Sequence, residues 1–314
     1  MMTLAQEIPI DVFAHVVTPH FYQKMLAIDD KIPEKASYIQ NQALVDFDYR
    51  RQHRTIPTRQ VISMMNLNPE DYVEPERALA LCQAANQELA DLVTTHTDQF
   101  CGAVAMVPMN NVAGAQAMMC DQVKSTANLL GIQLFTRALG RSIADPEFDG
   151  VFKTAAELGL PIWLHPVFDD RKPDNNIVFS WEYELTQAMR ELVVGGVFQR
   201  YPDLKIIVHH AGAMVPFFAG RINAIMTPAQ AADFHKFYVD TAILGNTAAL
   251  NLTVDYFGAD HVLFGTDAPF GILPVGASSK IAIAIEHLPL STAEKAQILF
   301  SNANQLLALP SNSK

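Results

Sequence analysis

The sequence predicts an α/β fold in which eight parallel strands close into a (β/α)8 TIM barrel. Short apolar runs that read as strands alternate with segments whose apolar residues recur at helical spacing, which is typical of βαβ units and a parallel sheet. Eight such runs match the strand number of the barrel, and the first, fifth, sixth and eighth of them run into a histidine or an aspartate that could bind a metal. A doubly wound open sheet gives a similar alternation and is the alternative architecture.

The expected strands are short and mostly apolar, and each is closed by a turn or a polar residue. In chain order they are IPIDVFA, RQVISMM, CGAVAMV, GIQLF, PIWLH, KIIVH, KFYVD and HVLFG. The segments between them, such as 75–96 and 146–159, begin with proline and carry apolar residues at helical spacing, so we expect helices there.

No Pro/Gly/Ser-rich linker, low-complexity tract or internal repeat divides the chain, so residues 1–314 are expected to form a single domain. Residues 18–59 carry three prolines and a basic cluster that includes Arg50, and they are expected to form a long first loop, or a lid, around a helix. Residues 279–308 are expected to form closing helices, the second of which is capped by Ser291 with Glu294 three residues later.

Composition favours a small-molecule partner. Half of the 314 residues are hydrophobic and the net charge is -11, whereas binding to nucleic acid or to an anionic membrane requires a basic surface. No signal peptide or membrane-spanning run is apparent, so a cytoplasmic location is expected. The three cysteines are odd in number and lack CxxC spacing, and they are expected to be reduced core residues.

Three polar strand ends form a candidate metal site. His15, His165 and Asp267 close the first, fifth and eighth expected strands, whose carboxyl ends meet at one face of a parallel barrel. A lone histidine in an apolar run is more often a core residue, and Asp267 could be only a turn residue. Their shared placement favours a catalytic site for one divalent ion, with Zn²⁺ expected and Mn²⁺ as the alternative.

The segments WLHPVF, VHHAGAMVPFFAGRI and VLFGTDAPFG resemble those of the amidohydrolase-related decarboxylases typified by aminocarboxymuconate-semialdehyde decarboxylase, which include γ-resorcylate decarboxylase. The resemblance extends from residue 8 to about residue 308. It implies a distorted (β/α)8 barrel of the metal-dependent hydrolase type with one divalent metal ion.

The resemblance also implies roles for individual residues. His165 and Asp267 match metal ligands, and His15 matches the second histidine of an HxH pattern on the first strand. His210 matches a histidine that lies beside the metal and acts as acid and base. Its neighbour His209 is expected to point to the opposite side and to serve in packing, because side chains alternate along a strand.

Phe13 departs from the family pattern, because it occupies the first position of HxH and a phenyl ring cannot coordinate a metal. Asp11 lies on the same face of the strand and is a weak candidate for a replacement ligand. The ion is therefore expected to have fewer protein ligands, with water or substrate oxygens completing its shell.

Two further residues have both a functional and a structural interpretation. Arg221 matches an arginine that crosses a dimer interface in the family and binds a substrate carboxylate, so a homodimer or higher homo-oligomer is expected; otherwise Arg221 is a surface or interface ion-pair residue. Asp240 ends the seventh expected strand. It either orients a metal ligand through a hydrogen bond, without binding the metal itself, or has a structural role.

The sequence thus predicts a metal-dependent, non-oxidative decarboxylase of a small aromatic or unsaturated carboxylic acid. In this reaction His210 would deliver the proton that replaces CO₂, and Arg221 would hold a carboxylate. The alternative is a hydrolase or hydratase on the same barrel, in which Asp267 takes a proton from the attacking water. A barrel that binds a metabolite without turnover is a third interpretation, motivated by Phe13.

Overall fold

A computed structural model describes residues 7–167 and 176–309 and confirms the first seven expected strands. They form one parallel sheet in the order β1-β2-β3-β4-β7-β8-β9. Its strands are β1 (Ile10–Val16), β2 (Arg59–Met64), β3 (Phe100–Met106), β4 (Leu129–Phe135), β7 (Ile162–His165), β8 (Ile206–Val208) and β9 (Tyr238–Val239). A small antiparallel pair, β5 (Arg137–Ala138) and β6 (Arg141–Ser142), follows β4.

The eighth expected strand is not a regular strand. Residues 262–268 nevertheless lie between the two edges of the sheet, because Leu263 N donates to Val239 O at 2.8 Å on one side and Asp267 N donates to Phe13 O at 2.8 Å on the other. The ladder is interrupted where Asp267 adopts a left-handed backbone with φ of 60°. The structure therefore has a curled sheet of seven regular strands with an irregular segment along its two edges.

A contact across the inside of the sheet shows how strongly it curls. Trp163 on β7 donates from Nε1 to the carbonyl of Val12 on β1 at 2.9 Å, although three strands separate β1 from β7 in the sheet order. Gly131 on β4 leaves room for the indole, since a Cβ there would lie 2.8 Å from its ring. The inner cluster of buried side chains includes Val12, Val61, Val104, Trp163, Ile207 and Leu263.

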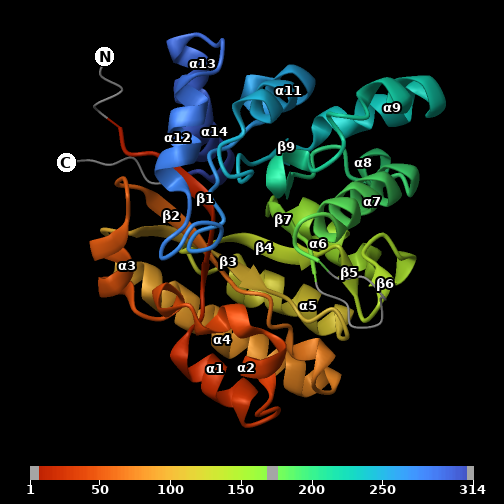
Figure 1. Ribbon diagram of the computed structural model, residues 1–314. Helices are drawn as coiled ribbons and strands as arrows, with labels where there is room; N and C mark the ends of the chain where they lie inside the picture. Colours follow the sequence, from red (N-terminus) through yellow and green to blue (C-terminus); the bar gives the residue numbers. More distant parts are fainter. Residues whose placement is uncertain (1–6, 168–175, 310–314) are drawn as a thin grey trace.

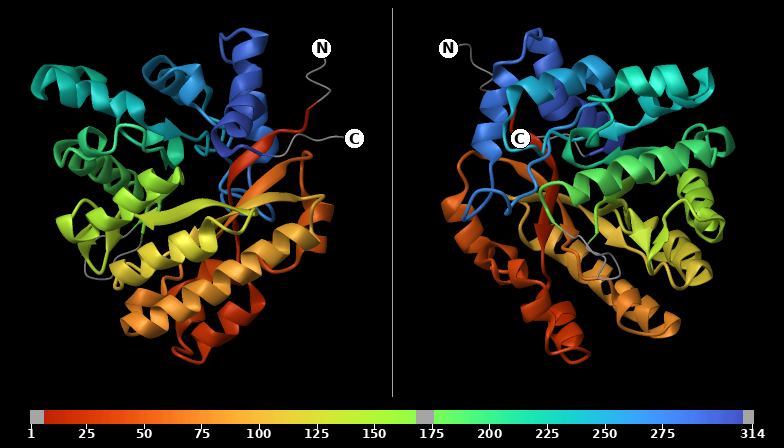
Figure 2. Two further views of the ribbon diagram at one scale, coloured as in Figure 1. Left: turned by 180° about the vertical axis from the view of Figure 1, so that it is seen from behind. Right: turned by 45° about the vertical axis from the view of Figure 1, so that its right-hand side comes forward.

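The helices surround the sheet, and the larger apolar cluster lies between sheet and helices (Figures 1 and 2). The α-helices are α1 (Pro19–Leu26), α2 (Ile32–Lys35), α3 (Phe47–His53), α4 (Pro75–Thr95), α5 (Val112–Met118), α6 (Asp149–Leu158), α7 (Ser180–Val194), α8 (Val197–Arg200), α9 (Ala219–Ile225), α10 (Pro228–Asp233), α11 (Thr247–Phe257), α12 (Ser278–Glu286), α13 (Thr292–Ala296) and α14 (Asn302–Leu307). A search of the described residues finds no helix that could span a membrane.

The first expected loop is largely helical. Residues 18–59 contain α1, α2, α3 and two 3-10 turns, because their apolar side chains pack into the main core despite the prolines. At the other end of the chain the structure confirms the closing helices and the reciprocal capping box of Ser291 with Glu294. The cysteines are free, but the expectation that all are core residues is wrong, because Cys101 is half-buried and Cys120 is exposed.

Candidate active site

The three predicted metal ligands meet at the carboxyl ends of the strands. His15 Nε2 lies 3.2 Å from His165 Nε2 and 3.3 Å from Asp267 Oδ1. Both histidines are 2% exposed and Asp267 is 18% exposed, so only the carboxylate side of the cluster is open. The convergence arises because β1 and β7 curl toward each other while residues 262–268 run alongside β1.

The hydrogen bonds of His165 fix which of its nitrogens can act as a ligand. Its Nδ1 contacts the Pro166 carbonyl at 2.5 Å, and because a carbonyl only accepts, Nδ1 carries the proton. Burial, together with the nearby His15 and His209, holds the pKa of His165 well below its usual value, so the ring is neutral. Its Nε2 therefore presents a lone pair toward His15 and Asp267.

The donor spacing fits neighbouring ligands of a divalent ion. With bonds of about 2.1 Å, adjacent donors of a tetrahedral site lie roughly 3.4 Å apart, close to both measured separations. His15 belongs to both pairs, and its Nδ1 contacts Ser63 Oγ at 3.1 Å, which leaves Nε2 for the site. Among the described residues no group of three such side chains is placed to hold a metal ion, so His15, His165 and Asp267 would have to rearrange around a bound ion.

Asp11 is not available as a replacement ligand. Its Oδ2 accepts from Thr266 Oγ1 at 2.6 Å and from Gln60 Nε2 at 2.8 Å, and its Oδ1 accepts from the backbone of Thr266 at 3.0 Å. Burial raises the pKa of Asp11 to about 6, against these hydrogen bonds. The carboxylate ties β1 to the segment that carries Asp267 and thereby positions two of the candidate ligands.

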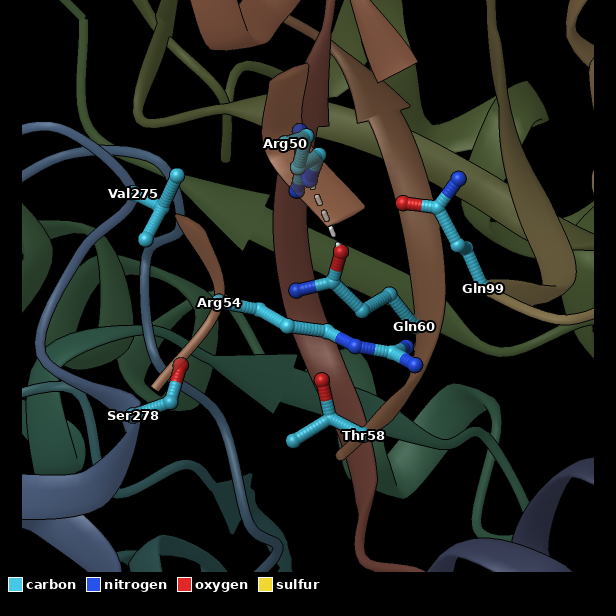
Figure 3. Close-up of a pocket in the computed structure, with 7 residues that line it drawn as sticks. All are labelled: Arg50, Arg54, Thr58, Gln60, Gln99, Val275 and Ser278. Carbon is cyan, nitrogen blue, oxygen red and sulfur yellow. Dashed lines mark hydrogen bonds between the residues drawn. The ribbon is translucent and has the colours of Figure 1, made fainter. Parts of the chain in front are cut away.

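Arg50 completes this support, and its role was not predictable from the basic cluster in which it lies. Its buried guanidinium donates to the carbonyl of His15 at 2.6 Å and to Gln60 Oε1 at 2.9 Å. A cavity of about 20 Å³, room for roughly one water, lies beside it (Figure 3). It is lined by Arg50, Arg54, Thr58, Gln60, Gln99, Val275 and Ser278. Because Gln60 begins β2 and Gln99 precedes β3, this cavity lies toward the amino ends of the strands, away from the histidines.

His210 lies beside the ligand set with one nitrogen free. Its Nδ1 is 3.2 Å from the Ala242 carbonyl and 3.7 Å from Glu182 Oε1, whereas its Nε2 has no hydrogen-bond partner among the described residues. Burial lowers the pKa of His210, but the carboxylates of Glu182, Asp267 and Asp240 outweigh it, so the net shift is upward. The net shift of the pKa favours the protonated form of His210, which is the form that an acid catalyst requires.

Glu182 is a site residue that the sequence reasoning missed. It lies in the first turn of α7, and its pKa is raised by burial and only partly offset by His210. A signal was present, since α7 follows β7 and the connections after barrel strands carry functional residues.

His209 is also part of this cluster. It is fully buried, its Nδ1 lies 2.6 Å from Asp240 Oδ2, and its ring stacks on Phe13 with centroids 3.4 Å apart. The alternation expected for a strand does not apply here, because β8 ends at Val208 and His210 has a left-handed backbone with φ of 55°. His209 does pack on Phe13, yet Asp240 also orients it.

Arg221 is the one predicted site residue that the structure does not bring to the others. It is exposed on α9, a helix without buried residues at the edge of the molecule (Figure 1). Its side chain has no hydrogen bond or ion pair with another residue within 7–167 or 176–309.

A curled parallel sheet with histidines and an aspartate at the carboxyl ends of its strands is the arrangement of a barrel-type metal-dependent enzyme. The chain belongs to the amidohydrolase family, whose model matches residues 45–309. The family resemblance inferred from the strand-end motifs is thereby confirmed.

Similar proteins in this family are decarboxylases. The 2-amino-3-carboxymuconate-6-semialdehyde decarboxylase of Dictyostelium discoideum is 28% identical over 269 residues, which cover 81% of this chain and 73% of that protein. The gamma-resorcylate decarboxylase of Polaromonas sp. is 28% identical over 259 residues, covering 74% and 78%. The fold is also similar to that of a dihydroxybenzoic acid decarboxylase from Polaromonas, whose crystal structure contains manganese and the inhibitor 2-nitroresorcinol. The TM-score is 0.79 at 22% sequence identity, and the match covers 96% of this chain and 97% of that one, which shows a shared fold.

Proposed function

We propose that the protein is a metal-dependent, non-oxidative decarboxylase of a small aromatic or unsaturated carboxylic acid. The observation that carries the proposal is the meeting of His15, His165 and Asp267 at 3.2–3.3 Å beside an acid-poised His210. The named activities of similar family members support the same reaction class.

The proposed architecture is a distorted (β/α)8 barrel in which residues 262–268 take the place of the eighth strand. The hydrogen bonds from Leu263 to Val239 and from Asp267 to Phe13 support closure, because they join this segment to both edges of the sheet. The proposed ligands of one divalent ion are His15, His165 and Asp267. Zn²⁺ suits this donor set, and the manganese in a related structure makes Mn²⁺ the alternative.

A bound ion would supply positive charge that holds oxygen atoms of the substrate and stabilises charge developing on them. His210 then donates a proton to the carbon that loses the carboxylate. The electron pair of the broken C–C bond forms the new C–H bond, CO₂ leaves, and His210 regains a proton from solvent. Nε2 delivers the proton, because Nδ1 is held by the Ala242 carbonyl and by Glu182.

Arg221 is proposed to act in a homodimer, binding a substrate carboxylate at the site of the neighbouring subunit. Its exposed position on α9, with no partner among the described residues of its own chain, supports this role. Guanidinium binds carboxylate through two parallel hydrogen bonds, which suits an anionic substrate.

The competing function is hydrolysis or hydration on the same site. Asp267 favours it, since a carboxylate within 3.3 Å of His15 could take a proton from an attacking water. The test is CO₂ release from a panel of aromatic and unsaturated acids that includes γ-resorcylate and 6-methylsalicylate, run beside ester, amide and lactone substrates. Release of CO₂ with a decarboxylated product supports the proposal, and hydrolysis without CO₂ overturns it.

A further inference from the structure

Beside the ligand set lies a buried nitrogen atom that no described residue satisfies. His209 is 0% exposed, and its Nε2 has no hydrogen-bond partner among the described residues. An unsatisfied buried polar atom destabilises the fold and is usually explained by an ion, a water or a functional role. This atom belongs to a residue type that binds divalent metals.

The partner of the other ring nitrogen sets the chemistry of this atom. His209 Nδ1 lies 2.6 Å from Asp240 Oδ2, and a carboxylate accepts from a ring N–H, so the proton of the neutral ring is on Nδ1. Nε2 is then a lone-pair donor. A histidine whose second nitrogen donates to a carboxylate is the usual form of a metal-ligating histidine.

His209 packs about as close to His165 as His15 does. Its ring centroid is 5.2 Å from that of His165, at an interplanar angle of 70°. The corresponding values for His15 and His165, whose Nε2 atoms are 3.2 Å apart, are 5.0 Å and 73°.

Phe13 stands where the family pattern has a metal ligand, and it contacts His209. It occupies the position that a metal ligand takes in the HxH pattern, on the same face of β1 as His15. Its ring stacks on His209 and meets His15 and His165 edge-on, at 4.9 Å and 5.4 Å. Phe13 cannot coordinate a metal, but the imidazole of His209, which can, stacks on the face of its ring.

We propose that His209 supplies through Nε2 the metal donor that Phe13 cannot supply, with Asp240 orienting the ring and Phe13 serving as its apolar wall. This inference rests on the proposed metal-dependent function. It moves the third histidine ligand from β1 to the end of β8.

The test measures metal affinity, which a packing residue would not control. Protein stripped with a chelator is titrated with Mn²⁺ and Zn²⁺ by calorimetry. His209→Phe keeps an aromatic ring for the stack but removes the donor, and it should weaken binding at least tenfold. Asp240→Asn leaves the shape unchanged but presents an amide N–H to Nδ1, which drives the ring proton to Nε2, and should weaken binding by about tenfold to a hundredfold. His287→Phe, at an exposed residue directly after α12, is the matched control and should leave affinity unchanged.

A donor swap gives the sharper result. Phe13→His combined with His209→Phe returns the donor to β1 and should restore affinity to within about threefold of the natural protein, whereas an affinity as low as that of His209→Phe alone would contradict the transfer of the donor. Circular dichroism and melting curves verify the fold. If His209→Phe does not fold, Asp240→Asn and the double variant decide.

The outcomes separate this inference from the function on which it rests. If His209→Phe and Asp240→Asn bind metal with the affinity of the natural protein while His165→Ala loses binding, the role of His209 is overturned and the proposed metal site is still supported. A natural protein that binds neither ion would overturn both.

Discussion

Gly265 lies where the smallest added side chain should disturb the site. A Cβ at this position would be 2.7 Å from Asp240 Cβ and 3.1 Å from Phe13 Cβ, whereas carbon atoms in contact prefer about 3.5–4.0 Å. Gly265→Ala therefore requires a shift of roughly 0.8 Å or more at Asp240, which holds His209 through a 2.6 Å hydrogen bond. Overpacking of this kind costs about 1–3 kcal/mol in the free energy of unfolding.

A displacement of about 1 Å in a catalytic constellation can lower the rate by roughly a hundredfold. We expect Gly265→Ala to lower kcat/KM for CO₂ release to that extent and to lower the urea midpoint. Gly220→Ala on α9 is the matched control for packing within the chain, since its Cβ would meet no atom within 4 Å, and the urea midpoint should be preserved there. A Gly265→Ala protein with natural rate and midpoint would refute the packing argument.

Three other expectations follow from single residues. His210→Asn should lower turnover by about 10²–10⁴-fold with metal retained, and a rate close to natural would remove its role as the acid. Sedimentation should show a dimer, and Arg221→Ala should lower kcat/KM by about tenfold or more; an active natural monomer would contradict the cross-subunit contact. Burial raises the pKa of Glu70 to about 7 from 4.5, so stability is lost as pH rises through that range. Glu70→Gln should thus be more stable than the natural protein by at most about 3 kcal/mol at pH 8 and equal to it at pH 4, as measured by urea unfolding.

The regular strands and their polar ends could be predicted from the sequence because both signals are local. The run PIWLH is apolar and ends in His165, and the structure places β7 at Ile162–His165. The irregularity of the eighth strand could not be predicted, because residues 262–268 pair with the sheet only through isolated bridges at Val262 and Ala268, which an apolar run does not reveal. The helices within 18–59 were missed because long-range packing, not local pattern, stabilises them.

The supporting residues of the site depend on contacts between distant parts of the chain. Arg50 donates to the carbonyl of His15, which lies 35 positions away in the sequence. Glu182 on α7 lies close to His210, which follows β8. The position of His209 could not be obtained from strand alternation, because the strand ends one residue before it. Such contacts are defined only when the sheet curls.

Metal-dependent CO₂ release tests the central claim most directly. The protein is stripped with a chelator, assayed with an acid that the natural protein decarboxylates, and titrated with Mn²⁺ or Zn²⁺. The expected result is no CO₂ release without metal and recovery that saturates at about one equivalent per chain, since one set of donors meets at the carboxyl ends of the strands. Full activity in metal-free protein would contradict the proposed site and mechanism.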